Sequence, residues 1–253
     1  KKMITLGIFG FGVVGQGLYE VLNKTKGMNA RIKKICIKDP NKQRPIDASY
    51  FTTNKDDILN DPQIDVVLEL INDTAAAFDI VSTAMRKGKA VVSASKKMIA
   101  ENIKALYDLQ FQYKVPFLYE ASSCASIPII RNLEEYYDND LLNAVEGICN
   151  GSTNYILTKI FEDNLNFDIA LRQAQEKGFA ESDPSLDVDG FDSKYKLCIL
   201  CLHAFGTFAK PEDVFNFGIG HLNDFDIQFA KQRGCTIKLL STCRRQNGNV
   251  VAY

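Results

Sequence analysis

The sequence predicts an α/β protein in which a doubly wound parallel sheet is followed by an α+β domain. Three observations predict this fold class. Short apolar runs alternate with amphipathic stretches as far as residue 120, a glycine-rich segment directly follows the first apolar run, and the alternation is lost beyond residue 120. Such an alternation is typical of parallel strands joined by right-handed helical crossovers.

The first half of the chain divides into expected strands and helices. Strands are expected at 3–9, 31–37, 64–70, 89–94 and 116–121, and helices at 13–25, 53–60, 74–88 and 99–114. The run IDVVLEL is apolar almost throughout, as parallel strands buried on both faces are. Gly88 is expected to end the third helix.

Beyond residue 120 the expected elements are mainly helices. Helical patterns occupy 129–138, 152–164, 167–178, 191–206 and 223–232, and strands are expected at 141–150 and 236–245. Residues 179–190 are acidic and are expected to form a loop. We place a domain boundary after residue 121, which divides the chain into 1–121 and 122–253.

Composition narrows the class of protein. Of the 253 residues, 46% are hydrophobic and 24% are charged, which is an ordinary globular balance. The formal net charge of −1 argues against nucleic-acid binding, because that needs a basic surface. No apolar run approaches the roughly 20 residues of a membrane span, and no export signal is visible. We therefore expect a cytoplasmic protein with no nucleic-acid or membrane partner.

The seven cysteines are irregularly spaced. Cys198 and Cys201 form a C-x-x-C, which can indicate redox chemistry or a zinc site. They lie in the apolar helical segment KLCILCLHAF, however, and no second ligand pair completes a zinc site. We expect reduced cysteines in the protein core, as in a reducing cytoplasm.

The segment GFGVVGQG matches G-x-G-x-x-G between an expected strand and an expected helix. Gly10 would permit the tight turn, Gly12 would let backbone approach a pyrophosphate, and Gly15 would allow close contact of helix and strand. The alternative is a purely structural turn. The context favours a Rossmann-type dinucleotide site, with N–H groups of the helix start facing the phosphates. Its expected cofactor-binding residues are Gly10, Phe11, Gly12, Val13, Val14 and Gly15.

The end of the second strand, ICIKDPNKQR, is expected to contact the adenosine ribose. Asp39 there can accept hydrogen bonds from the two ribose hydroxyls, which favours NAD. Lys38, Lys42 and Arg44 can instead bind a 2′-phosphate, which favours NADP. A solvated charged loop is the alternative for some of them. The cofactor is NADP or NAD, and the basic residues favour NADP.

An acidic segment, ESDPSLDVDGFDSKYK, starts at Glu181. Three roles are open for this segment. It can bind a metal, although it lacks EF-hand spacing. It can also be simply solvated, or it can recognise a small ammonium-bearing substrate. Asp192 and Lys196 are four residues apart and share one face of a helix. A lysine at the start of an apolar helix can act as a general acid tuned by a carboxylate. Spacing alone does not decide between this role and a structural ion pair.

Five motifs together resemble the homoserine dehydrogenase family. GFGVVGQG, VVSASK, YEASSCASIPII, GICNGSTNYIL and GFAESDPSLDVDGFDSKYK occur in the family's order, between residue 7 and about residue 205. The last two are the most specific, because other dinucleotide-binding enzymes lack them. The resemblance implies NAD(P)H-dependent reduction of L-aspartate 4-semialdehyde to L-homoserine. It also implies that 1–121 binds the dinucleotide and that 122–253 binds substrate and forms a homodimer.

The resemblance also implies roles for individual residues. Lys196 would be the proton donor to the carbonyl oxygen, aided by Asp192, and Lys96 would lie near the nicotinamide and substrate. Glu181 would bind substrate, and Asp187 would lie near its amino group. A sodium ion would be held near Glu120, Ser123, Ala125 and Ile127.

The sequence departs from the family pattern at three places. The A-N-K motif is Ala94-Ser95-Lys96, and the glycine-rich V-G-G-G stretch is Ser123-Cys124-Ala125-Ser126. The family's later G-x-G-A-G segment has no counterpart before Tyr253, so we expect the second domain to be incomplete.

Two rival functions remain open from sequence. One is a semialdehyde dehydrogenase that works through a thiolate, for which Cys124 and Cys149 are available. Of the two histidines, His203 is expected in the core or an interface and His221 at the surface. The other rival is a non-catalytic NAD(P)-binding sensor. The segments YILTKIF and IKLLSTC can supply the contact surface of a homodimer. The alternative is that both belong to the core of the domain.

Overall fold

The two halves of the chain contain different kinds of sheet. The computed structural model describes residues 2–25 and 27–253, and the chain divides into two compact units, Lys1–Ser126 and Ile127–Tyr253. The sequence-based boundary after residue 121 lies slightly earlier. The first unit holds a parallel sheet and the second a small antiparallel one, which confirms the expected α/β class with a following α+β part.

The first unit is built on six parallel strands in the order β3-β2-β1-β4-β5-β6. Chain order therefore reverses at β1, from which the strands run to β3 on one side and to β6 on the other, as in a doubly wound sheet. The strands are β1 Ile4–Phe9, β2 Ala30–Cys36, β3 Phe51–Thr52, β4 Val66–Glu69, β5 Ala90–Ser93 and β6 Phe117–Leu118.

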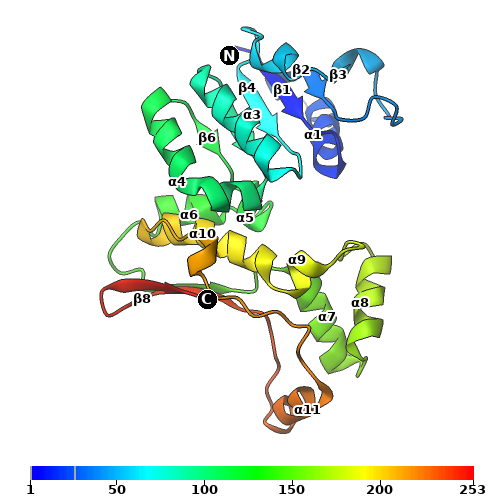
Figure 1. The fold of residues 1–253 in the computed structure, drawn as a ribbon, viewed down its shortest axis with the longest axis vertical. Helices are drawn as coiled ribbons and strands as arrows, with labels where there is room; N and C mark the ends of the chain where they lie inside the picture. The colour runs from blue at the N-terminus through cyan, green and yellow to red at the C-terminus, as the bar shows by residue number, and fades with distance from the viewer. Residues whose placement is uncertain (1, 26) are drawn as a thin grey trace. The chain divides into compact units, whose positions relative to one another are not determined.

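Helices connect these strands and cover the sheet (Figure 1). They are α1 Val13–Lys24, α2 Asp56–Leu59, α3 Thr74–Arg86, α4 Lys96–Tyr113 and α5 Ala121–Cys124, with a 3-10 turn η1 at Ala48–Tyr50. Helices α3 and α4 pack side by side. Helix α3 starts where the Asp73 side chain accepts from the N–H of Ala76 and stops just before Gly88, whose φ is +75°.

Apolar strand residues form the core of this unit. Ile8, Ile35 and Val67 are fully buried, as expected for central parallel strands covered on both faces. Phe11, directly after β1, is 8% exposed and packs into the same cluster. The core therefore anchors the segment that joins β1 to α1.

The second unit has a three-stranded antiparallel sheet, in the order β7-β8-β9, and several helices. The strands are β7 Ala144–Gly147, β8 Ser241–Gln246 and β9 Asn249–Ala252. The helices are α6 Ile129–Glu135, α7 Gly151–Glu162, α8 Phe167–Glu176, α9 Ser185–Val188, α10 Phe191–Phe205 and α11 Asp224–Gln232, with η2 at Pro211–Asp213. Helix α10 packs on β8 and β9.

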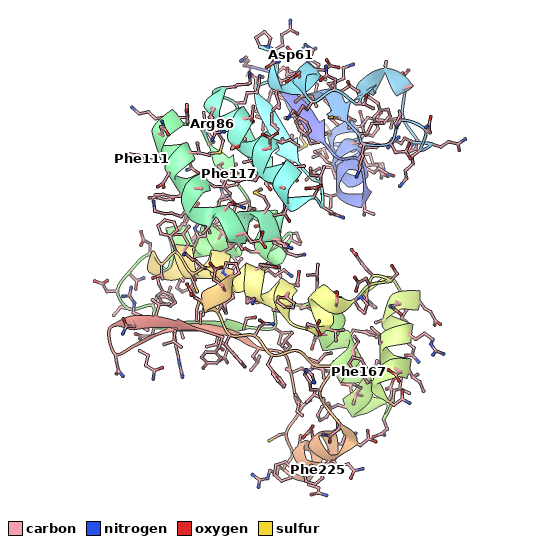
Figure 2. All side chains as sticks on the ribbon, in the orientation of Figure 1. Asp61, Arg86, Phe111, Phe117, Phe167 and Phe225 are labelled. Atoms are coloured by element: carbon pink, nitrogen blue, oxygen red, sulfur yellow. The ribbon has the colours of Figure 1, made fainter. Side chains whose placement is uncertain are left out.

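A second core lies between α7, α8 and the segments that follow them. Ile156, Leu157 and Ile160 of α7 are buried in this cluster, and Phe167 at the start of α8 packs against it (Figure 2). The apolar face of YILTKIF is therefore core within the unit. This confirms the alternative interpretation of the segment as core for these three residues.

Three local expectations were wrong. The acidic segment 179–190 contains the short helix α9, because its backbone closes a helical turn from Pro184 to Val188. The last strand begins at Ser241 rather than at residue 236 and pairs with β9, which was not expected. Helix α4 begins at Lys96 instead of residue 99.

The expectation of buried, reduced cysteines is confirmed for Cys198 and Cys201, but it does not hold for Cys235, which is exposed. All seven are free thiols, and Cys198 and Cys201 are completely buried in α10. Within residues 2–25 and 27–253, no helix has both the length and the apolar character needed to cross a membrane.

Candidate active site

The glycine-rich turn between β1 and α1 has the conformations expected of a dinucleotide-binding turn. Gly10 has φ +96°, and a Cβ added to it would lie 2.5 Å from the carbonyl oxygen of Leu70. A Cβ on Gly15 would lie 2.9 Å from the carbonyl oxygen of Gly10. Only glycine fits both positions, because one needs left-handed backbone and the other a close approach of helix to strand.

Gly12 differs from Gly10 and Gly15, because a Cβ added to it would meet no atom within 4 Å. It is the N-cap of α1, and no side chain caps this helix start. Val13 and Val14 are 89% and 58% exposed. The first turn of α1 thus offers accessible backbone N–H groups at the positive end of a helix, which is the arrangement that holds a pyrophosphate.

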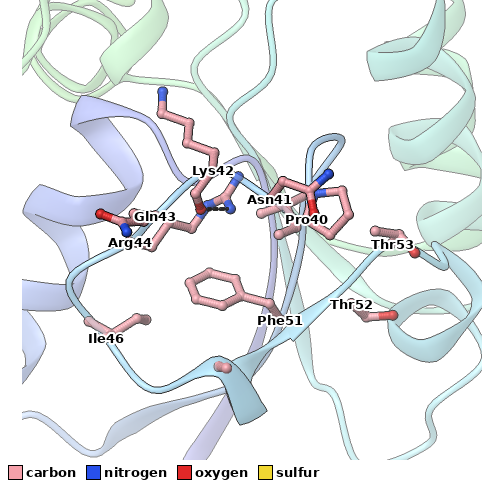
Figure 3. Close-up of a pocket in the computed structure, with 11 residues that line it drawn as sticks. Pro40, Asn41, Lys42, Gln43, Arg44, Ile46, Phe51, Thr52 and Thr53 are labelled. Atoms are coloured by element: carbon pink, nitrogen blue, oxygen red, sulfur yellow. Dashed lines mark hydrogen bonds between the residues drawn. The ribbon is translucent and has the colours of Figure 1, made fainter.

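A cavity of about 750 Å³ opens beyond the ends of β2 and β3 (Figure 3). The Arg44 guanidinium lies 5.2 Å from the centre of the Phe51 ring and donates a 2.6 Å hydrogen bond to the carbonyl oxygen of Lys42. Asp39 and Lys38 are exposed and are not among the residues lining this cavity. Of the four residues expected to contact the ribose or its phosphate, Lys42 and Arg44 therefore line the cavity.

The sequence analysis missed Glu69, a completely buried glutamate at the end of β4. Its carboxylate accepts hydrogen bonds from the Ser93 hydroxyl at 2.6 Å and from the backbone N–H of Ile71 at 2.8 Å. The Ser95 hydroxyl lies 2.9 Å from Glu69 and 2.8 Å from the carbonyl oxygen of Ile71. Glu69 thereby holds the loops after β4 and β5, directly before Lys96. A charged residue inside an apolar strand was the available signal.

In the second unit, Asp192 and Lys196 form the ion pair that their spacing suggested. The two residues lie one turn apart on α10, and Lys196 Nζ is 2.7 Å from Asp192 Oδ2. Their side chains are 4% and 16% exposed, so water screens the pair weakly. Lys196 also donates a 2.7 Å hydrogen bond to the carbonyl oxygen of Cys149. An ammonium has three N–H donors, and these two contacts leave one for a ligand.

Asn150, another residue that the sequence analysis did not single out, joins the acidic residues. Its side-chain amide donates to Asp187 Oδ1 at 2.7 Å and to Asp192 Oδ2 at 3.0 Å. Its Oδ1 accepts from the backbone N–H of Thr153, so the same side chain caps α7. One buried amide therefore fixes both carboxylates relative to a helix start. The sequence predicted a helix from residue 152, but neither the Asn150 cap nor its two acidic partners.

Ser152 gives Asp187 a second contact. Its hydroxyl lies 2.8 Å from Asp187 Oδ2 and 2.5 Å from the carbonyl oxygen of Phe179, and its single proton can serve one of them at a time. Asp187 is thus held by two neutral groups and stays partly exposed. Its carboxylate can accept from a ligand ammonium.

The other predicted residues are not all brought together. Glu181, Asp183 and Asp189 are exposed, and Glu181 makes its contact with Gln175 through its backbone carbonyl. Lys96 opens α4 in the first unit and is partly buried. Asp192, Lys196 and Asp187 therefore form one network within the second unit.

The residues expected to hold sodium lie around α5. Glu120 is the N-cap of α5, Ser123 is in the helix, Ala125 follows it with φ +52°, and Ile127 opens the second unit. Ser123 is 2% exposed and its hydroxyl has no hydrogen-bond partner. Across residues 2–25 and 27–253, no group of three or more His, Cys, Asp or Glu residues is arranged to bind a metal ion.

The two thiols of α10, Cys198 and Cys201, have pKa values raised above the ordinary thiol value. Burial raises the pKa of Cys198 to about 12. A hydrogen bond to Cys243 raises the pKa of the Cys201 thiol, and the same bond lowers the pKa of Cys243. The backbone carbonyl of Cys149 accepts the hydrogen bond from Lys196.

The two histidines lie as expected. His203 Nδ1 is 2.8 Å from a Glu134 carboxylate oxygen, with the histidine side chain 10% exposed. His221 is exposed and packs near the ring of Phe217.

A doubly wound parallel sheet with this glycine turn, followed along the chain by a second unit with a buried lysine–aspartate pair, defines a two-part dinucleotide-binding protein. Two family profiles agree with this class. One, described as homoserine dehydrogenase, NAD binding domain, matches residues 10–120, and the other, described as homoserine dehydrogenase, matches residues 128–252. The chain belongs to the homoserine dehydrogenase family.

Relatives and solved structures support this assignment. The homoserine dehydrogenase of Bacillus subtilis is 34% identical over 98% of this chain and 60% of its own length. The enzyme of Synechocystis is 35% identical over 94% of this chain and 57% of its own length. The crystal structure of a homoserine dehydrogenase from Thiobacillus denitrificans has 32% identity and a TM-score of 0.93, over 98% of this chain and 60% of that chain. The chain thus spans about three fifths of the relatives it matches.

Proposed function

We propose that this chain catalyses the reversible NAD(P)H-dependent reduction of L-aspartate 4-semialdehyde to L-homoserine. The observation that carries the proposal is the buried Asp192–Lys196 pair, which is fixed by the Cys149 carbonyl and by Asn150. Such a pair presents one ammonium N–H in a weakly hydrated setting. The family assignment supplies the substrate class.

The proposed role of Lys196 is proton transfer at the reacting oxygen. When bound, the dinucleotide supplies the hydride that reduces the aldehyde carbon. Lys196 then donates a proton to the oxygen, and Asp192 orients the ammonium and offsets its charge. In the reverse direction the same amine accepts the hydroxyl proton. Lys96 is proposed to polarise the same oxygen.

Substrate binding is proposed to use the carboxylates of the acidic segment. Asp187 presents a partly exposed carboxylate that two neutral donors already orient, which suits an α-ammonium group. Glu181 is proposed to bind substrate from its exposed position in the same segment. Holding the substrate at both ends would set the geometry of hydride transfer.

The glycine turn and the cavity beside Phe51 fit a dinucleotide. The open backbone at Gly12 suits the pyrophosphate, and Gly10, Phe11, Val13, Val14 and Gly15 form the rest of the turn. We favour NADP, because the Arg44 guanidinium lines the cavity and guanidinium groups bind phosphate in a bidentate manner. Lys42 adds positive charge there, and Lys38 is a more distant candidate.

A sodium ion near Glu120, Ser123, Ala125 and Ile127 is a further part of the proposal. The buried Ser123 hydroxyl supports it, since an unsatisfied buried oxygen can be satisfied by an ion. The test is the sodium dependence of activity in Ser123→Ala. An unchanged dependence would remove Ser123 from the site.

We also propose that the enzyme is a homodimer in the cytoplasm, as the family resemblance implies. The free state of its seven cysteines fits a reducing compartment. Sedimentation equilibrium would test the dimer.

The central experiment is homoserine-dependent reduction of NAD and of NADP, each followed by absorbance. Turnover with a preference for NADP is expected. Dinucleotide binding without any oxidation of homoserine would instead support a non-catalytic sensor. A preference for NAD would leave the activity in place and overturn only the role of Arg44.

A further inference from the structure

The second unit contains a small cavity that the proposed reaction does not use. It has a volume of about 250 Å³ and lies between the start of α10, the loop at 215–217, the segment at 238–241 and Tyr253. Helix residues Ser193, Lys194 and Leu197 line it. At 100° per residue, these three occupy a different face of α10 from Asp192 and Lys196. The cavity is therefore separate from the proposed proton-transfer pair.

Ser193 marks this cavity as a binding site. The residue is 4% exposed, and its hydroxyl has no hydrogen-bond partner. A buried hydroxyl without a partner lowers the stability of the folded state, so native proteins rarely keep one without a reason. A ligand that accepts a hydrogen bond inside the cavity would remove this cost.

The charges around the cavity indicate the sign of that ligand. Lys194 and Lys238 line it, and no acidic side chain does. Lys238 donates 2.8 Å hydrogen bonds to Asn154 Oδ1 and Thr158 Oγ1, which are both neutral. Among residues 2–25 and 27–253, neither ammonium pairs with a carboxylate. The cavity therefore favours an anion, and it disfavours a ligand that carries an ammonium group.

The remaining walls restrict the ligand further. Leu197, Phe215, Phe217 and Leu239 give the cavity an apolar lining, which suits a hydrocarbon tail. A volume of about 250 Å³ is below the roughly 300–1,000 Å³ of drug-sized sites, so a dinucleotide does not fit. A short aliphatic chain with one carboxylate matches both the charges and the size.

We propose that this cavity binds a small monocarboxylate with a short aliphatic tail. Its carboxylate accepts from the Ser193 hydroxyl and lies beside the ammonium groups of Lys194 and Lys238, while the tail contacts Leu197 and Phe217.

The loop that forms one wall also holds the acidic segment. Asn216 donates from its side-chain amide to the carbonyl oxygen of Asp189 at 2.7 Å, and the N–H of Ile219 donates to that of Val188 at 2.8 Å. Asp187 directly precedes this pair. A ligand in the cavity thus contacts the loop that positions the proposed substrate-binding carboxylate.

The test is calorimetric titration of the full 253-residue chain with isovalerate. Saturable one-to-one binding of isovalerate is expected. Isoamyl alcohol and isoamylamine have the same aliphatic tail without the carboxylate, and they should bind at least tenfold more weakly. Ser193→Ala removes only the unpartnered hydroxyl, so the protein stays folded and isovalerate binding weakens about tenfold or more. Lys194→Gln weakens binding by a smaller factor, and Lys177→Gln, on α8, leaves it unchanged.

Two outcomes would overturn the proposal. One is the absence of saturable isovalerate binding, and the other is binding of equal affinity in Ser193→Ala. Lys196→Ala separates this cavity from the proposed substrate site, since it should abolish homoserine oxidation and leave isovalerate binding intact. If isovalerate binding were lost in Lys196→Ala and kept in Ser193→Ala, the carboxylate would occupy the substrate site instead.

Discussion

Two buried carboxylates, one in each unit, are held in opposite ways. Glu69 is completely buried, and its carboxylate contacts neutral groups, namely two serine hydroxyls and one backbone N–H. Asp192 is 4% exposed and accepts from the amide of Asn150 and from the ammonium of Lys196. The difference teaches that burial alone does not define the role of a carboxylate. Asp192 pairs with an ammonium, for which we propose proton transfer, whereas Glu69 braces two loops.

The largest expected effect is on Lys196. Lys196→Ala should lower kcat for homoserine oxidation by about 10²–10⁴-fold, because it removes the proposed general acid and base. Dinucleotide affinity, measured by fluorescence titration, should not change. Lys177→Ala, an exposed lysine of the same unit, is the control and should stay within a few-fold of the unchanged protein. Normal turnover of Lys196→Ala would contradict the mechanism.

The comparison is sharpened by changing each carboxylate to its amide. Asp192→Asn keeps the shape but removes the charge beside Lys196, so kcat should fall by about tenfold or more. Steady-state kinetics would check this. An unaltered kcat would mean that the pair is structural and that Asp192 and Glu69 play the same kind of role.

Glu69→Gln should show the reverse pattern. The amide keeps one acceptor oxygen but places an NH₂ beside donors, so the free energy of unfolding should fall by about 1–3 kcal/mol. Denaturant unfolding would measure this, and kcat should change by only a few-fold. A large loss of kcat without loss of stability would show that Glu69 contributes to the chemistry.

A smaller effect is expected at Cys149. Lys196 is held by the backbone carbonyl of this residue, so Cys149→Ala should retain activity within a few-fold. The rival cysteine-dependent mechanism requires a nucleophilic thiol, so it predicts that replacing that cysteine abolishes activity. Alkylation of the exposed Cys235 in the same assay provides a labelling control.

The smallest expected effect concerns Asp61, a less buried carboxylate than either of the pair. A hydrogen bond from Lys33 holds the pKa of Asp61 below its ordinary value of 3.8. The folded state therefore binds fewer protons, and this contribution to stability is present above pH 3.8 and is lost as pH falls through the lowered pKa. Asp61→Asn should reduce the loss of stability below pH 4 by less than about 1 kcal/mol. Acid unfolding followed by circular dichroism would measure it.

Much of the fold was predictable because its signals are local. Apolar runs and glycine positions identified most strands and helices of the first unit, but not β3 or α5. The residues of G-x-G-x-x-G are contiguous, and their backbone requirements at Gly10 and Gly15 follow from the turn itself. The shorter elements, such as β9 and α9, were missed because few residues form them and tertiary contacts decide them.

The sequence by itself determined the class of fold, the glycine turn and the Asp192–Lys196 pair, since a helix brings residues four apart onto one face. Only the tertiary structure decided which distant groups complete these features. Asn150 reaches carboxylates that are 37 and 42 positions away, and Glu69 meets serines 24 and 26 positions away. The physical reason is that a buried polar group must find partners wherever folding brings them, and sequence distance does not reveal that choice.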